Sequence, residues 1–123
     1  MLRFILPFAL LLFITPAQAL THEEQMEQTL AIALEVQNQI LECWSLPPGY
    51  ENRSISVRLA FFGDGQLDGE PVLEPDSILV ARKYPQLMRS VVHAIESCLP
   101  FGGLEALGAG PNERFDITVH FQS

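Results

Sequence analysis

The segment SISVRLAF at residues 54–61 alternates apolar with polar or small side chains. A period of two places the apolar residues on one side of an extended chain, so the segment predicts a β-strand with one buried face. The apolar positions are Ile55, Val57, Leu59 and Phe61. The segment RFDITVHF at residues 114–121 repeats this pattern near the C-terminus. Both segments therefore predict strands of a sheet that is covered on a single face.

A tight turn and a shorter strand are expected directly after the first strand. The sequence GDGQ at residues 63–66 contains residues that tolerate positive φ, so the chain can reverse there as a hairpin. The next strand should cover residues 67–73. Gly69 and Pro71 interrupt it, and the missing N–H of Pro71 favours the edge or the end of a strand.

An amphipathic helix is expected before the first strand. Thr21 and Glu24 have the spacing of a capping box, and Pro47-Pro48-Gly49 ends the helical pattern. We expect the apolar positions, which recur mostly at steps of three or four, to face the core and the polar ones to face water. The apolar set is Met26, Leu30, Ala33, Leu34, Ile40, Leu41 and Trp44, and the polar set is Gln25, Gln28, Glu35, Asn38 and Gln39.

A second helix is expected between the second and third strands. Pro85 suits the first turn of a helix, and Pro100 stops it just after Cys98. Its apolar stripe is Leu87, Met88, Val91, Val92, Ile95 and Leu99. A helical turn is expected at residues 78–83, and the Gly- and Ala-rich residues 102–111 read as a loop.

The order helix, strand, strand, helix, strand predicts an α+β fold, a two-layer α-β-β-α-β sandwich. A right-handed crossover through the second helix would place the third strand beside the first and antiparallel to it. The expected result is a three-stranded antiparallel sheet in the order 2-1-3, with the helices on one face. The third strand then has a free edge.

The chain begins with a hydrophobic leader. Arg3 supplies a positive charge, residues 4–14 are apolar, and Ala17-Gln18-Ala19 fits a signal-peptidase site. We therefore expect residues 1–19 to be a signal peptide cleaved after Ala19 and residues 20–123 to form one domain outside the cytosol. An uncleaved membrane anchor is the alternative, although a span needs about 20 apolar residues and prolines interrupt this stretch.

The expected export determines how the two cysteines of the chain, Cys43 and Cys98, are interpreted. In an oxidising compartment we expect them to form a disulfide, whereas two separate buried thiols are the alternative. The bridge would close a long loop, which in the chain-entropy model stabilises the fold by about 4 kcal/mol.

The expected mature chain is strongly acidic. Without Arg3 it keeps 6 of the 7 basic side chains and all 15 acidic ones, so its net charge is 6 − 15 = −9. Nucleic acid and anionic membrane surfaces are therefore unfavourable partners.

No catalytic motif is recognisable. His22, His93 and His120 are far apart, and none belongs to a metal-binding pair spaced by four residues. We therefore expect no enzyme activity, no catalytic residue, no metal and no cofactor. The alternative is a small secreted enzyme or inhibitor on a repurposed fold. Its candidate acidic cluster is Asp64, Asp68 and Glu70.

The ordered motifs resemble the C-terminal domain of TolA, in the TolA/TonB C-terminal family, over residues 25–123. The resemblance is carried by Cys43-Trp44 before the Pro47-Pro48-Gly49 break, Asp64-Gly65-Gln66-Leu67 before Glu70-Pro71-Val72, Ala94-Ile95 with Cys98-Leu99-Pro100-Phe101, and the final strand. It implies a non-catalytic periplasmic domain that binds envelope proteins such as TolB or Pal. The implied role is cell-envelope integrity of the Tol-Pal type or coupling of transmembrane transport.

Two departures from TolA are expected: this is a stand-alone domain without a membrane anchor, and it lacks the long helical rod. Phe115 also stands where a Trp is more usual.

The candidate binding site is the free edge of the third strand, where an extended peptide could add as a fourth strand. The expected partner-binding residues are Arg114, Asp116, Thr118 and His120. Backbone bonds would supply the affinity, and the outward side chains of Asp116, Thr118 and His120 would tune selectivity. The alternative is an edge that its own charges protect and that contacts nothing.

Overall fold

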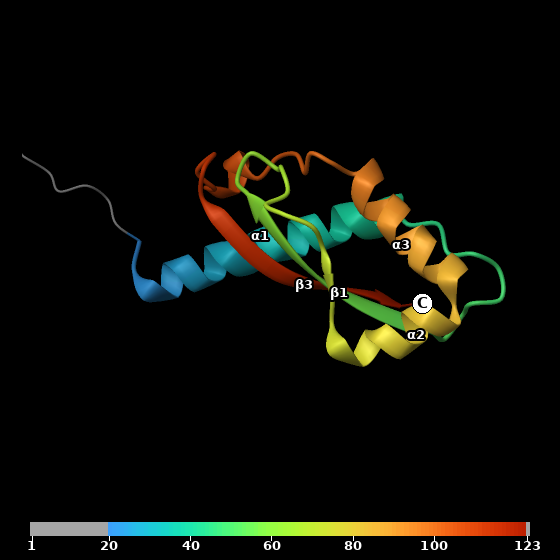
Figure 1. Ribbon diagram of the computed structural model, residues 1–123. Helices are drawn as coiled ribbons and strands as arrows, with labels where there is room; N and C mark the ends of the chain where they lie inside the picture. The colour runs from blue at the N-terminus through green and yellow to red at the C-terminus, as the bar shows by residue number, and fades with distance from the viewer. Residues whose placement is uncertain (1–19, 123) are drawn as a thin grey trace, which may run out of the picture.

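The computed structural model describes residues 20–122, so the predicted signal peptide at residues 1–19 lies outside the described residues. Its elements occur in the expected order (Figure 1). They are α1 (His22–Cys43), β1 (Ser54–Phe62), β2 (Val72–Leu73), the 3-10 turn η2 (Pro75–Ser77), α2 (Ile78–Lys83), α3 (Pro85–Ser97), the 3-10 turn η3 (Glu105–Leu107) and β3 (Arg114–Gln122). None of the helices in residues 20–122 is long and apolar enough to cross a membrane.

The three strands form an antiparallel sheet in the order β2-β1-β3, which confirms the predicted fold class and topology. β1 and β3 pair along their whole length, from Ser54 opposite Gln122 to Phe62 opposite Arg114. β2 is much shorter than expected and pairs only through Val72 and Leu73. The interruption at Gly69 and Pro71 is the physical reason, because the chain leaves β1 between an isolated bridge at Leu67 and the start of β2.

One face of the sheet carries the core. The apolar residues of β1 and β3 alternate with exposed ones and pack against α1 and α3 (Figure 1). The largest fully buried side chains include Phe61, Phe101, Phe121, Ile32, Ile40, Ile55 and Leu59. The other face of the sheet is left to polar side chains, as the alternation predicts.

The predicted core face of α1 is partly wrong. Thr21 and Glu24 do form the capping box, with Thr21 Oγ1 accepting from the Glu24 N–H at 3.1 Å. The buried residues, however, are Ile32, Val36 and Ile40. Met26 and Leu30 are each 60% exposed and Leu34 is 49% exposed. The apolar arc of α1 is wider than the surface it covers, so one flank of the helix stays in water.

Similar adjustments apply to α3 and to residues 102–111. Val92 is 41% exposed, whereas the small Ala94 takes a place in the core. The Gly-rich segment is more than a loop, because it contains η3 and buries Leu104 and Ala109. Phe101 just before it stacks edge-on against Phe61, with ring centroids 5.7 Å apart. This connection therefore closes one end of the core.

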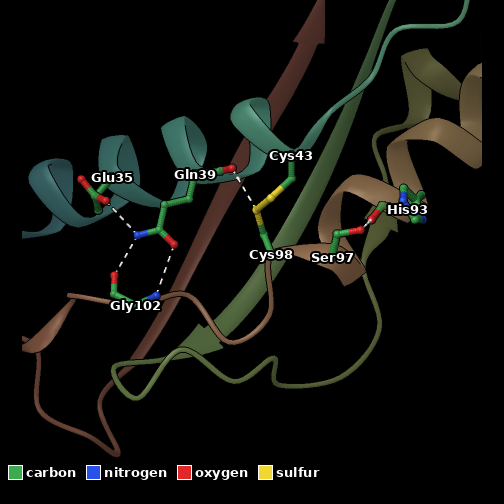
Figure 2. The surroundings of a disulfide bond; sticks show 7 residues. All are labelled: Glu35, Gln39, Cys43, His93, Ser97, Cys98 and Gly102. Carbon is green, nitrogen blue, oxygen red and sulfur yellow. Dashed lines mark hydrogen bonds between the residues drawn. A yellow bond between two sulfur atoms is a disulfide. The ribbon is translucent and has the colours of Figure 1, made fainter.

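Cys43 and Cys98 form the predicted disulfide between the end of α1 and the residue after α3, with Cα atoms 6.2 Å apart (Figure 2). Gln39, expected to face water, lies one helical turn earlier and contacts Gly102. Its Nε2 donates to the Gly102 carbonyl at 2.7 Å, and its Oε1 accepts from the Gly102 N–H at 3.2 Å. The disulfide and this pair of amide hydrogen bonds both join the C-terminal end of α1 to the chain that follows α3.

Trp44 packs beside this junction, as expected for a core aromatic. Its Nε1 donates to the Ser90 hydroxyl at 2.9 Å, and its ring meets Phe121 edge-on at 5.4 Å. The indole thereby joins the end of α1 to α3 and to the last residues of β3.

Candidate functional site

The backbone groups of β1 alternate between its two neighbouring strands. The Ser56 N–H donates to Ser77 Oγ at 2.8 Å, and the Ser56 carbonyl accepts from the Glu74 N–H at 3.0 Å. The Ala60 carbonyl accepts from the Asp68 N–H at 2.8 Å. The backbone N–H and C=O groups of the even-numbered residues of β1 thus point toward β2. Those of the odd-numbered residues point toward β3.

The register carries this alternation into β3. Ser56 lies opposite His120 and Ala60 lies opposite Asp116. In an antiparallel pair, residues opposite each other that do not exchange hydrogen bonds direct their N–H and C=O groups outward. The outward-directed residues of β3 are Arg114, Asp116, Thr118, His120 and Gln122. No strand among residues 20–122 pairs with this side of β3. We call it the open edge.

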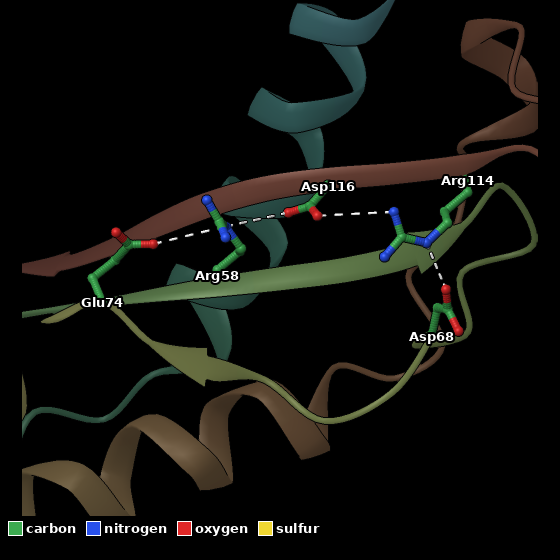
Figure 3. A network of polar contacts seen from close by, with 5 residues as sticks. All are labelled: Arg58, Asp68, Glu74, Arg114 and Asp116. Carbon is green, nitrogen blue, oxygen red and sulfur yellow. Dashed lines mark hydrogen bonds and ion pairs between the residues drawn. The ribbon is translucent and has the colours of Figure 1, made fainter.

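The side chains of the same residues lie on the polar face of the sheet. Asp116 lies between two arginines, with Oδ1 3.7 Å from Arg58 Nε and Oδ2 3.8 Å from Arg114 Nη1 (Figure 3). Arg58 also reaches Glu74, and Arg114 Nε donates to Asp68 Oδ2 at 2.6 Å. This hydrogen bond raises the pKa of Arg114. The row alternates in charge and is half-exposed, so it fixes side-chain positions more than it stabilises the fold.

Two further edge residues complete this polar face. His120 Nδ1 and Ser56 Oγ are 2.7 Å apart, which joins β3 to β1 across the register pair. Thr118 is half-buried and lies between Asp116 and His120 along the strand. Arg114, Asp116, Thr118 and His120 therefore lie in one row on the same face of β3, as the period-two pattern predicts.

A groove of about 570 Å³ runs between the open edge and the N-terminal half of α1. Its wall on α1 includes the exposed Met26 and Leu30 together with Ala33. Its wall on β3 is Asp116, Ile117 and Thr118. The uncovered apolar flank of α1 thus faces the strand edge whose backbone groups are unpaired.

Asp116 and Thr118, which line this groove on β3, are among the predicted site residues, whereas Met26 and Leu30 on α1 are not. Met26 and Leu30 were assigned to the core because they recur at helical spacing, yet Ile32 and Val36 compete for that face. The available signal was the width of the apolar arc on α1, which exceeds what a three-stranded sheet can cover.

The acidic residues of the enzyme alternative do not converge. Asp64 Oδ1 accepts from the Gln66 N–H within the turn at 3.0 Å, and Asp68 is paired with Arg114. Glu70 lines a different hollow, beside α3. Among residues 20–122 no group of three or more His, Cys, Asp or Glu side chains is placed to hold a metal ion.

A family model described as uncharacterised conserved protein UCP034077 matches residues 24–123. No curated protein and no solved structure matches the chain.

Proposed function

The chain belongs to the family of uncharacterised conserved protein UCP034077, and we propose that it is a non-catalytic protein-binding domain that receives an extended segment of a partner along β3. The observation that carries the proposal is the groove in which an unpaired strand edge meets an uncovered apolar helix flank. Each feature alone is common on protein surfaces, but together they provide both contacts that an added strand needs.

The backbone supplies the first contact. Five residues of β3 direct their N–H and C=O groups outward, so an added strand can pair along the whole open edge. Each such hydrogen bond contributes about 0.5–1.5 kcal/mol net of the lost bonds to water. This part of the affinity does not depend on the partner's side chains, which makes the site tolerant of sequence.

The helix flank supplies the second contact and the main selectivity. Residues of the added strand alternate between the two faces of the sheet, and those on the Ile117 side meet Met26 and Leu30. The best segment therefore has an apolar side chain at every second position. Burying that surface contributes about 25 cal/mol per Å².

The polar face of the sheet adds to the selectivity for the partner segment. Side chains of the added strand on this face lie beside Asp116, Thr118 and His120. Asp116 already sits between Arg58 and Arg114, so its charge is largely balanced. Small or hydrogen-bonding residues fit this side better than large apolar ones.

A lone extended segment suits the groove better than a second copy of the chain. Pairing two β3 strands would bring a second α1 to the same face of the sheet, where the first α1 already flanks the edge (Figure 1). Packed helices need about 8–10 Å between their axes, whereas paired strands are only about 4.8 Å apart. The groove thus favours a partner without a helix of its own at that position.

The cellular setting follows from the expected signal peptide and from the resemblance to the TolA C-terminal domain. We place the mature domain in the periplasm, where the Cys43–Cys98 disulfide is stable. Envelope proteins such as TolB or Pal are the first partners to test, in cell-envelope integrity or in transport coupling.

The test is calorimetric titration of the disulfide-bonded domain, residues 20–123, with purified TolB, with Pal and with extended peptides selected from a random library. Thr118→Pro removes one outward N–H while sparing the bonds to β1, which an edge position tolerates. Thr118→Val is the matched control, because it keeps that N–H.

We expect Thr118→Pro to weaken binding about tenfold or more and Thr118→Val to change it only slightly. Equal binding by both folded variants would reject the open edge as the site. Selected peptides that bind when TolB and Pal do not would retain the edge and reject the Tol-Pal partners.

A further inference from the structure

A further hollow lies at the other end of the molecule from the N-terminus of α1, where the chain entering β1 meets α2 and the start of α3 (Figure 1). It measures about 380 Å³, and its lining includes Arg53, Ser54, Leu79, Lys83 and Tyr84. The charged side chains in this lining are Arg53 and Lys83, and both are cations. No carboxylate side chain of residues 20–122 lines it.

The two cations of this hollow lie beside the same aromatic ring. Arg58 and Arg114 each lie within 4 Å of two carboxylates. Arg53 and Lys83 instead approach one aromatic ring, at 4.6 Å and 5.6 Å from the centroid of Tyr84. Within residues 20–122, neither forms an ion pair with a carboxylate. Arg82 and Arg89 likewise form no ion pair among these residues, so the shared aromatic ring is what distinguishes Arg53 and Lys83.

Placing two like charges around one ring costs repulsion that a bound anion would offset. The ring itself is held in place by Tyr50, whose ring meets Tyr84 edge-on at 5.7 Å. The nearest carboxylate in the sequence, Glu51, accepts a hydrogen bond from the Gly49 N–H and does not line the hollow. Among residues 20–122, no carboxylate lines the hollow or pairs with its two cations, so the positive charge of these side chains is concentrated there.

The hollow also has an apolar side. Leu79 is 75% exposed, the highest value among the large hydrophobic residues of the described chain, and it lies in the same lining as Lys83. A ligand that carries an anionic group on an apolar body would contact the cations and Leu79 together. Water would leave both surfaces when it binds.

We propose that this hollow binds an oxyanion, phosphate or carboxylate, carried on an apolar body. The net charge of the chain does not oppose this, because salt screens distant charges over about 8 Å at physiological ionic strength. Net charge disfavours an extended polyanion such as nucleic acid, whereas a single anionic group senses mainly Arg53 and Lys83. The site is separate from the groove at β3, so the two proposals stand or fall independently.

The test is a titration of ¹⁵N-labelled domain, residues 20–123, with octyl phosphate below its micelle concentration and with inorganic phosphate. We expect saturable amide shifts at Arg53, Ser54 and Lys83, with octyl phosphate binding more tightly than inorganic phosphate. Arg53→Gln and Lys83→Gln should each weaken octyl phosphate binding about tenfold. These side chains are exposed, so the variants keep the fold.

Arg82→Gln is the matched control, because Arg82 precedes Lys83 on α2 but does not line the hollow. It should change affinity by no more than about twofold. Leu79→Ser should reduce binding of octyl phosphate to the level of inorganic phosphate. Absence of saturable binding at millimolar concentration, or an equal effect of Arg82→Gln and Lys83→Gln, would overturn the proposal.

Vesicles distinguish the two sources of such an anion. Co-sedimentation with phosphatidylglycerol vesicles but not with phosphatidylcholine vesicles would assign a lipid headgroup. Binding of octyl phosphate without vesicle binding would assign a dissolved small molecule. Either result supports the site.

Discussion

At the residue scale, Gly65 shows how one position limits the fold. Its φ is +90°, and a Cβ added there would overlap the backbone of Phe101, whose N–H donates to the Gly65 carbonyl at 3.0 Å. The hairpin after β1 and the connection after α3 therefore touch through their backbones. Only a residue without a side chain allows that approach.

We expect Gly65→Ala to lower the free energy of unfolding by about 2–4 kcal/mol, from positive φ and from displacement of Phe101. Gly69→Ala is the matched control. Gly69 has a φ of +86° but nothing within 4 Å of an added Cβ, so its loss should be about 1 kcal/mol. Urea unfolding followed by circular dichroism measures both, and equal losses would mean that the close approach to Phe101 costs nothing.

Leu30 and Ile32 separate binding from stability within one turn of α1. Leu30 is 60% exposed and lines the groove, whereas Ile32 is fully buried. Leu30→Ser should change the free energy of unfolding by less than about 1 kcal/mol and weaken binding of the partner segment. Ile32→Ala should cost about 2–5 kcal/mol. If Leu30→Ser unfolds the domain instead, the flank of α1 belongs to the core and no groove exists there.

At the scale of elements, the disulfide connects α1 to the end of α3. Its contribution to stability can be measured directly by reducing it. Its sequence separation is 55 residues, and the chain-entropy model gives it about 4 kcal/mol. Reduction of the native protein should lower the midpoint of urea unfolding strongly. A Cys43→Ser, Cys98→Ser double variant should unfold at the reduced midpoint with or without reductant. A midpoint unchanged by reduction would show that Gln39, Gly102 and the helix packing already suffice.

The local patterns of the elements could be predicted, because they depend on neighbours in the sequence. The period-two strands, the capping box at Thr21 and the pairing of Cys43 with Cys98 are confirmed. The chosen face of α1 could not be predicted, because Met26 and Ile32 are both apolar and only the packing of α1 on the sheet leaves one exposed and the other buried.

Connections were predicted less well than strands and helices. β2 contracts to Val72–Leu73, and residues 101–109 contribute Phe101 and Leu104 to the core. Both depend on contacts between segments far apart in the sequence, which no local pattern encodes. The candidate site shows the same division. The residues of β3 that line the groove follow from the local period-two pattern, whereas the exposure of Met26 and Leu30 on α1 depends on tertiary packing.

At the scale of the whole molecule, the fold leaves its two sheet edges in different states. On the β2 side, bonds from Ser56, Ala60 and Phe62 to the following connection cover the edge of β1 even where β2 is absent. On the β3 side, nothing among residues 20–122 pairs with the edge. An asymmetric sheet with one closed and one open edge is suited to accepting a strand at a single place.

Amide hydrogen exchange along β3 tests this claim most directly, with and without a bound segment. The account predicts fast exchange at Asp116, Thr118 and His120 in the free domain and slow exchange at Ile117 and Val119, which bond to β1. Binding should slow the first three amides and leave the other two unchanged. Equal protection of both sets in the free domain, or binding without added protection at Asp116, Thr118 and His120, would contradict strand addition at β3.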